Sequence, residues 1–214
     1  MKNMTKRRRA LLSFSKKKSR LPDGLVEVKW LQCTGGQYCV TDIYPVSSGQ
    51  NTFTAIRGDI TLLDRDTSAF KIGCGWNESG TTMKYEASYS QGTFRYYYGP
   101  STGATRSFAI GGVYPRDVHY EINIDNVYGL DAPYSTFQYQ YNATSPIAIS
   151  NGWTSNNIQY KPFKIFNVNQ PLYEFVPCYR ESDGKTGFCK ITLADNTMQF
   201  FPTTGEEWVI GPVV

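Results

Sequence analysis

Short segments rich in β-branched and aromatic residues recur along this chain at a spacing of roughly 8–12 residues. Turn-favouring pairs separate them, such as Ser79-Gly80, Gln91-Gly92, Gly99-Pro100 and Gly111-Gly112. Glycine supplies positive φ and proline removes a backbone donor, so each pair ends a strand. The pattern predicts an antiparallel β-sandwich or barrel. The expected strands before the C-terminal region span residues 26–31, 38–41, 52–63, 70–76, 82–89, 93–98, 106–110, 118–124, 136–141 and 159–168.

The C-terminal region, residues 164–212, has the clearest strand pattern. Apolar segments at 164–168, 172–179, 187–193 and 198–201 are separated by Gln170-Pro171, residues 182–185 and Asp195-Asn196. Between residues 172 and 179 both alternating sets of side chains are largely apolar. Both faces of this strand are therefore expected to be covered, as in the interior of a sandwich.

Composition agrees with an all-β chain. Aromatic residues make up 15% of the 214 residues, with 16 Tyr and 12 Phe, and these residues favour strands. No helical periodicity persists beyond two turns, and no apolar run approaches the roughly 18–20 residues that a membrane span requires. A membrane protein is not expected, and the length suits one β domain.

The charge is divided between a basic N-terminal segment and a mildly acidic remainder. Nine of the 22 basic residues lie in residues 1–20, which contain no acid, leaving 13 basic against 18 acidic residues in the rest. The turn former Leu21-Pro22-Asp23-Gly24 marks the boundary, so we expect an arm at 1–24 and a β domain at 25–214. The arm is expected to anchor the chain through Lys6, Arg7, Arg8, Arg9, Leu11, Leu12, Phe14, Lys16, Lys17, Lys18 and Arg20.

Three interpretations of the arm remain open: a docking peptide on a larger assembly, a disordered cationic tail, and a nucleic-acid contact. The third is disfavoured because Phe14 is the arm's only aromatic residue and no basic fold is attached to it. The segment does not resemble a signal peptide, since Ala10-Leu11-Leu12 is too short for an apolar core. Folding in a reducing cytosol is therefore expected.

The cysteines and the single histidine do not form a metal motif. The five cysteines make no CxxC pair, and His119 has no histidine at ligand spacing. We expect buried free thiols, with a Cys178–Cys189 disulfide as the alternative. Asp64 and Asp66, and the segment around Asp125, lack the calcium-loop pattern. Neither a metal nor a cofactor is expected.

Catalytic groups are equally sparse. His119 alternates with Asp117 and Glu121 on one face of an expected strand, which predicts a surface cross-strand contact rather than a catalytic base. No pair of carboxylates stands out as a glycosidase pair. The chain is therefore interpreted as non-enzymatic, and a glycan-degrading enzyme is the least favoured alternative.

Aromatic residues in or beside expected loops could bind a sugar or another protein. Sugar sites on β-sandwiches place apolar sugar faces on exposed rings flanked by amides and acids, and protein interfaces also favour Tyr and Trp. The candidates for either role are Trp76, Tyr97, Tyr134, Tyr139 and Trp153.

Two parts of the chain together resemble a known family. The opening reads VEVKWLQCTGGQY and continues to Thr41-Asp42-Ile43. The C-terminal part contains Lys164-Ile165-Phe166, YEFVPCYR at 173–180, Ser182-Asp183-Gly184, Phe200-Phe201 and Gly205. These pieces, about a third of the chain, resemble bacteriophage and prophage structural proteins with a laminin-G-like, concanavalin-A-like jelly roll.

The resemblance implies an all-β, antiparallel jelly-roll sandwich whose N- and C-terminal strands lie together. It also implies a non-enzymatic virion protein: a capsid decoration, head-fibre or tail-associated protein, made in the bacterial cytoplasm and located in the virion. Other virion proteins, met through residues 1–20, and further copies of the chain are the implied partners. The alternative is a receptor-binding lectin for a host surface polysaccharide.

Overall fold

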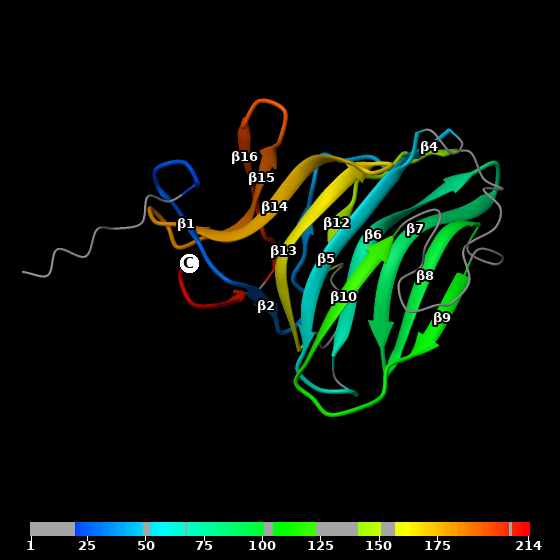
Figure 1. Ribbon diagram of the computed structural model, residues 1–214, viewed down its shortest axis with the longest axis horizontal. Helices are drawn as coiled ribbons and strands as arrows, with labels where there is room; N and C mark the ends of the chain where they lie inside the picture. Colours follow the sequence, from blue (N-terminus) through cyan, green and yellow to red (C-terminus); the bar gives the residue numbers. More distant parts are fainter. Residues whose placement is uncertain are drawn as a thin grey trace, which may run out of the picture.

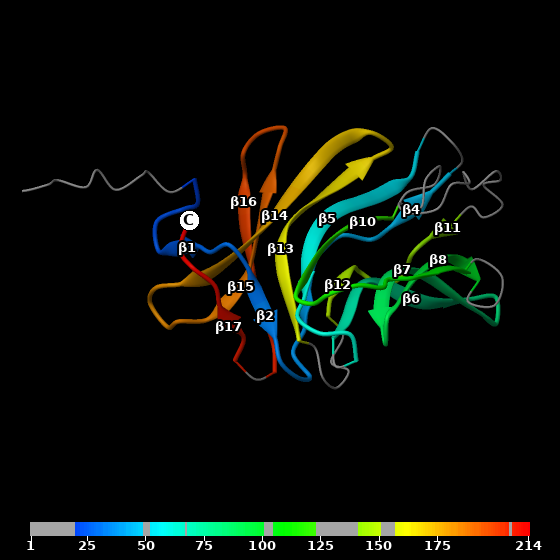
Figure 2. The same ribbon diagram turned by 60° about the horizontal axis from the view of Figure 1, so that its bottom comes forward.

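The structure is a computed structural model that describes residues 20–48, 52–66, 68–100, 105–122, 141–150, 157–205 and 207–214. Within these ranges the chain is all-β and contains no helix. Antiparallel sheets pack as a sandwich, which confirms the fold class at this level. Figure 2 shows the layers: β5, β10 and β13 lie in one, and β6, β7 and β8 lie in the other.

The larger sheet has nine strands, with the order β10-β5-β13-β14-β15-β16; in addition β1 pairs with β14, and β2 pairs with both β13 and β17. Its strands are β1 (Leu25–Glu27), β2 (Leu31–Cys33), β5 (Thr54–Leu62), β10 (Arg116–Ile122), β13 (Ile158–Asn167), β14 (Gln170–Arg180), β15 (Thr186–Thr192), β16 (Met198–Pro202) and β17 (Val209–Ile210).

The second sheet has six strands in the order β3-β12-β6-β7-β8-β9. They are β3 (Cys39–Val40), β12 (Ala148–Ile149), β6 (Ala69–Glu78), β7 (Thr81–Ser90), β8 (Thr93–Pro100) and β9 (Thr105–Ala109). A separate two-stranded ribbon pairs β4 (Val46–Ser47) with β11 (Tyr141–Asn142).

Aromatic side chains from both sheets fill the space between the layers. The Phe70 ring on β6 lies 4.8 Å from Tyr120 of β10 and 5.7 Å from Tyr160 of β13, centroid to centroid. On the C-terminal side, Phe163 stacks on Phe175 with centroids 4.9 Å apart. One continuous aromatic core therefore joins the sandwich to the C-terminal strands, which agrees with the sequence's bias toward Tyr and Phe.

The C-terminal strands are covered on both faces. Phe175 and Phe188 point into the main core, whereas Val176, Cys178, Cys189 and Ile191 form a second apolar cluster on the opposite face. Double coverage was predicted for residues 172–179 and is confirmed for Phe175–Cys178, which are all buried.

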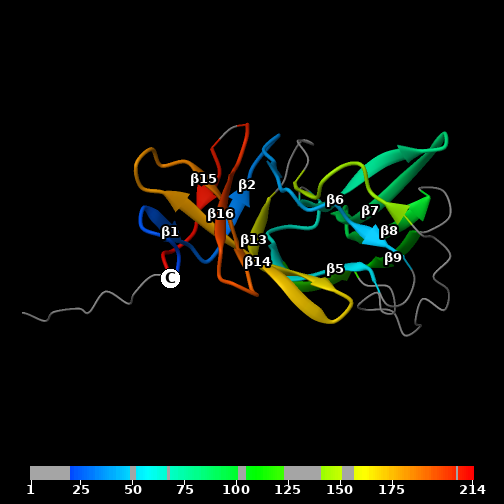
Figure 3. The ribbon, with the colours of Figure 1, turned by 90° about the horizontal axis from the view of Figure 1, so that it is seen from above.

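The two ends of the described chain lie together. β1 pairs with β14, β17 pairs with β2, and Val28 bridges Val213. Figure 3 shows the C-terminus beside β1, away from β8 and β9. The expected meeting of the terminal strands is confirmed.

One expected strand was wrong in its extent. Residues 26–31 form two short strands, β1 and β2, instead of one. The chain breaks between them because β1 pairs with β14 while β2 pairs with β13 and β17. Most other predicted strands are present within a few residues, but 136–140 lies outside the described residues, and the very short β4, β12 and β17 were not predicted.

Candidate functional site

Arg20, the last basic residue of the arm, is bound to the body. Its guanidinium lies 2.7 Å from a carboxylate oxygen of Glu27 on β1 and 2.9 Å from one of Glu174 on β14. These two acids raise the pKa of Arg20, chiefly through the hydrogen bond to Glu27. The arm's exit point is therefore tied to two neighbouring strands.

Leu21 anchors the same point by apolar contact. It is 6% exposed and joins Val176, Cys178, Cys189 and Ile191 in the second cluster, on the outer face of β14 and β15. The turn predicted at 21–24 is present, with the Leu25 amide donating to the Pro22 carbonyl at 3.1 Å and φ 86° at Gly24. We call Arg20 and Leu21 the arm root.

The arm root lies on the arm side of the boundary that the sequence predicts between an arm at 1–24 and a β domain at 25–214. Arg20 and Leu21 contact the β-sheet, and the Gly24 carbonyl accepts a hydrogen bond from the Glu181 amide at 2.9 Å, although the sequence pattern placed these residues in the arm. Arg20 was expected to bind a partner, but the structure gives its charge two acids of the chain itself. The other ten arm residues lie outside the described residues: Lys6, Arg7, Arg8, Arg9, Leu11, Leu12, Phe14, Lys16, Lys17 and Lys18.

The five aromatic candidates are only partly placed. Tyr97 lies half-buried on β8, with the Lys84 ammonium 4.5 Å from its ring centroid. Trp76 is in β6, where the structure describes the backbone. Tyr134, Tyr139 and Trp153 lie outside the described residues. Tyr97 is thus the one candidate of the five whose side chain is described, and the expected site of these residues stays a prediction.

His119 makes the surface contact that its strand pattern predicted. On β10 it faces Asp59 of β5, and its Nδ1 lies 2.9 Å from the carboxylate. Nearby on the same face, Arg57 pairs with Glu121 at 2.7 Å and Lys161 with Asp117 at 2.8 Å. These polar pairs run across the outward face of β10, β5 and β13.

The cysteines are free and buried, so the disulfide alternative for Cys178 and Cys189 is not adopted. Burial raises the pKa of Cys39 to about 12 and that of Cys189 to about 11. A thiol with so high a pKa is a poor nucleophile at neutral pH.

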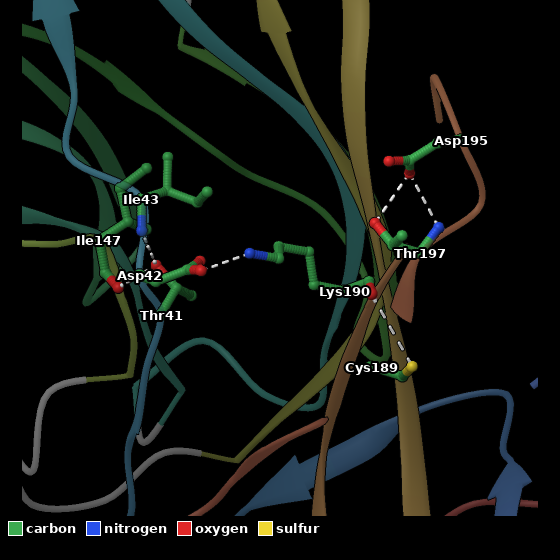
Figure 4. Close-up of polar contacts among 8 residues, drawn as sticks. All are labelled: Thr41, Asp42, Ile43, Ile147, Cys189, Lys190, Asp195 and Thr197. Atoms are coloured by element: carbon green, nitrogen blue, oxygen red, sulfur yellow. Dashed lines mark hydrogen bonds and ion pairs between the residues drawn. The ribbon is translucent and has the colours of Figure 1, made fainter. Parts of the chain in front are cut away.

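An ion pair that the sequence did not predict joins Lys190 to Asp42 (Figure 4). Lys190 lies on β15, is 8% exposed, and has its ammonium near the rings of Tyr173 and Phe201. Asp42 lies in the loop after β3 and keeps 42% of its side chain exposed. A buried charge needs such a partner, so Lys190 holds the Asp42 carboxylate in place.

The backbone around Asp42 is also fixed. The Thr41 hydroxyl donates to the Ile147 carbonyl at 2.8 Å, and the Ile147 amide donates to the Ile43 carbonyl at 2.8 Å. Figure 4 shows Thr41, Ile43 and Ile147 on one side of Asp42 and Lys190 on the other. Asp42 is therefore held from both its backbone and its side chain.

A pocket of about 340 Å³ opens beside Asp42. Its walls come from the loop after β3, the start of β5, and the hairpin that joins β13 to β14. The volume is at the lower end of the range of small-molecule sites. The lining residues are Asp42, Ile43, Tyr44, Val46, Thr52, Phe53, Thr54, Ile165, Phe166, Asn167, Leu172 and Tyr173.

The lining combines aromatic rings with open polar groups. Tyr44 is 52% exposed, and Phe53 and Phe166 form part of the apolar wall. Asn167 uses its carbonyl oxygen to accept the Phe53 amide at 3.2 Å. Within the part of the chain that is described, the Asn167 amide nitrogen, the second Asp42 oxygen and the hydroxyls of Tyr44 and Tyr173 make no hydrogen bond.

Sequence reasoning missed this pocket. Asp42 enters the sequence analysis only within the motif Thr41-Asp42-Ile43, Tyr44 follows that motif, and Asn167 and Tyr173 lie on either side of a turn. A signal existed at Lys190, since a lysine inside the apolar segment 187–193 needs a nearby acid if both strand faces are covered.

These observations define an all-β sandwich protein with a fixed arm root and a small aromatic pocket. No family model, curated protein or solved structure matches the chain. Among the described residues there is no cluster of three potential metal ligands and no helix long and apolar enough to span a membrane.

Proposed function

We propose that this protein is a non-enzymatic structural component of a bacteriophage virion, attached to the particle by its basic N-terminal arm. The β domain, which we assign to the laminin-G-like jelly rolls, is displayed outward as a capsid decoration, head-fibre or tail-associated module. Its partners are other virion proteins and further copies of itself. The proposal draws on the resemblance of residues 25–43 and 164–205 to that class of proteins.

The observation that carries the proposal is the fixed exit point of the arm. Eight basic residues precede Arg20, and Arg20 and Leu21 are locked on β1, β14 and β15. A cationic segment leaving a rigid point favours an acidic partner surface at that end of the body, because charge complementarity positions the contact. The residues that contact the particle lie in 1–19, and Arg20 fixes the end of this segment to the body.

The test is incorporation into particles. The variant has Lys6–Arg9 and Lys16–Lys18 all replaced by glutamine. It is supplied in trans while particles assemble in cells that lack the wild-type gene. We expect the copy number per purified particle to fall at least about tenfold, because several charge contacts are lost together. Arg20 stays unchanged, because its charge is already paired with Glu27 and Glu174 of the body.

Two controls make the result specific. Replacing Leu11, Leu12 and Phe14 by serine separates apolar docking from charge, and Lys161→Gln removes a body charge of the same type. The Lys161→Gln variant is expected to incorporate as the wild type does. Full incorporation of the glutamine arm variant would refute the anchor.

A second candidate function is a receptor-binding lectin for host surface polysaccharide. The pocket beside Asp42 favours it, because the exposed Tyr44 ring lies in one lining with an acid and an amide, which is a composition that suits a sugar. The isolated body tested against host surface polymers decides this candidate, and binding to none of them would remove it.

A further inference from the structure

We propose that the pocket beside Asp42 binds one ring of an uncharged saccharide, with Tyr44 as the stacking residue and Asp42 and Asn167 as hydrogen-bonding residues. The inference rests on the second candidate function, the lectin. It assigns the site to residues other than the five aromatic candidates of the sequence pattern.

The apolar part of the pocket suits a flat sugar face. Tyr44, which lines the pocket, is 52% exposed, and Phe53 in the pocket wall is 1% exposed. The outer ring gives a ligand apolar area to cover, and the buried ring resists deformation. Aromatic rings gain by covering the C–H groups of a pyranose in this way.

The polar part of the pocket offers both an acceptor and a donor. The second carboxylate oxygen of Asp42 can accept from a sugar hydroxyl, since the first is taken by Lys190. The Asn167 amide nitrogen can donate to a sugar oxygen, because the Asn167 carbonyl is held by the Phe53 amide. A hydroxyl-bearing ligand needs both kinds of partner, and a hydrocarbon ligand would leave them unpaired.

The charge of the pocket selects a neutral ligand. Among the described lining residues Asp42 alone carries a charge at neutral pH, and the buried Lys190 ammonium compensates it. An anionic sugar would meet the Asp42 carboxylate, and a cationic sugar would compete with Lys190 for it. An uncharged pyranose is neither repelled by Asp42 nor in competition with Lys190.

The pocket also lies apart from the arm root. Figures 1 and 2 show β4 and the β13–β14 hairpin away from β1. An anchored protein can therefore keep the pocket open to a host polymer while residues 1–19 contact the particle.

The test is a titration of the full chain with methyl α-glucopyranoside, methyl α-mannopyranoside and methyl β-galactopyranoside, followed by NMR. At least one is expected to bind with a dissociation constant on the order of 1 mM and to shift resonances of pocket residues. Tyr44→Ala and Asn167→Asp are each expected to weaken binding about tenfold, the latter because it removes the donor and keeps the acceptor for Phe53. Tyr38→Ala, at a tyrosine 38% exposed outside the pocket, is expected to bind as the wild type does.

The titration separates the pocket assignment, the ligand class and the lectin function. If the protein binds a host polymer or a glycoside and both pocket variants bind equally well, the lectin stands and the pocket assignment is wrong. Tighter binding of glucuronate or glucosamine than of the neutral glycosides overturns the ligand class. If no saccharide binds, the pocket and the lectin both fail, while particle anchoring is judged separately by incorporation.

Discussion

Val168 is the residue whose backbone conformation is hardest to explain from its own chemistry. It takes φ 57° in the two-residue turn between β13 and β14, a region that β-branched residues rarely enter. Its amide donates to the Phe53 carbonyl at 2.9 Å, and its side chain packs on Phe53, Ala55 and Phe166. These contacts hold the strained turn beside Asn167, in the wall of the pocket.

The strain predicts that Val168→Asn stabilises the protein. Asparagine tolerates positive φ, so we expect relief of the strain to raise the free energy of unfolding by about 1 kcal/mol. The loss of the apolar contact with Phe53, Ala55 and Phe166 reduces this gain. Urea unfolding at neutral pH measures this change.

The matched control is Asn196→Val, because Asn196 takes the same φ of 57° in the exposed turn between β15 and β16. Here valine introduces the strain, and the free energy of unfolding should fall by about 1 kcal/mol. If both variants changed the free energy of unfolding in the same direction, the positive φ would not be the cause of the change.

At the scale of elements, β10, β5 and β13 carry a polar ladder on their outward face. Asp117 accepts hydrogen bonds from Lys161 of β13 at 2.8 Å and from Thr61 of β5 at 2.5 Å. The hydrogen bond from Lys161, and then that from Thr61, lowers the pKa of Asp117 below 3.8. One carboxylate thus links three strands.

This linkage predicts a pH dependence of stability. Because the folded pKa of Asp117 is lower than the unfolded one, its contribution is present above the unfolded value and is lost as the pH falls through the folded value. Between about pH 5 and pH 2, Asp117→Asn should therefore lose less stability than the wild type, by about 0.5 kcal/mol for so exposed a pair. Asp23→Asn is the control, since Asp23 makes no ion pair among the described residues. Parallel acid-unfolding curves for wild type and Asp117→Asn would contradict the linkage.

At the scale of the whole molecule, the arm root sets where the folded body begins. Removing residues 1–19 leaves Leu21 in its cluster and Arg20 on its two acids. Removing residues 1–24 takes away both and uncovers Val176 and Cys178 on the outer face of β14.

We therefore expect the chain that starts at Arg20 to unfold like the full chain, and the chain that starts at Leu25 to be less stable by about 2–3 kcal/mol. Leu21→Ala in the full chain should reproduce most of that loss, because the Arg20 pairs are partly exposed and contribute little. Thermal and urea unfolding of the three variants measure the effect. A large loss of stability on removing residues 1–19 alone would show that these residues contribute to the folded body.

Much of the architecture was predictable from the sequence because strand alternation and turn chemistry are local. The turn-separated segments of 52–122 and 158–202 correspond to strands, the double coverage of 172–179 is confirmed at Phe175–Cys178, and His119 makes its surface contact. Each of these features depends on residues a few positions apart. The break between β1 and β2 was missed because it depends on which strands lie beside them.

The candidate pocket depends on contacts between distant parts of the chain. Asp42 and Lys190 are 148 positions apart, and the pocket wall joins residues 42–54 to residues 165–173. Alternation tells which face of a strand is buried, but it carries no information about which distant loop meets it. The all-β class and the excess of basic residues in 1–20 can be read from the sequence, because both depend on local pattern and composition. Strand order and sheet twist place Arg20, Asp42 and Asn167 beside their partners.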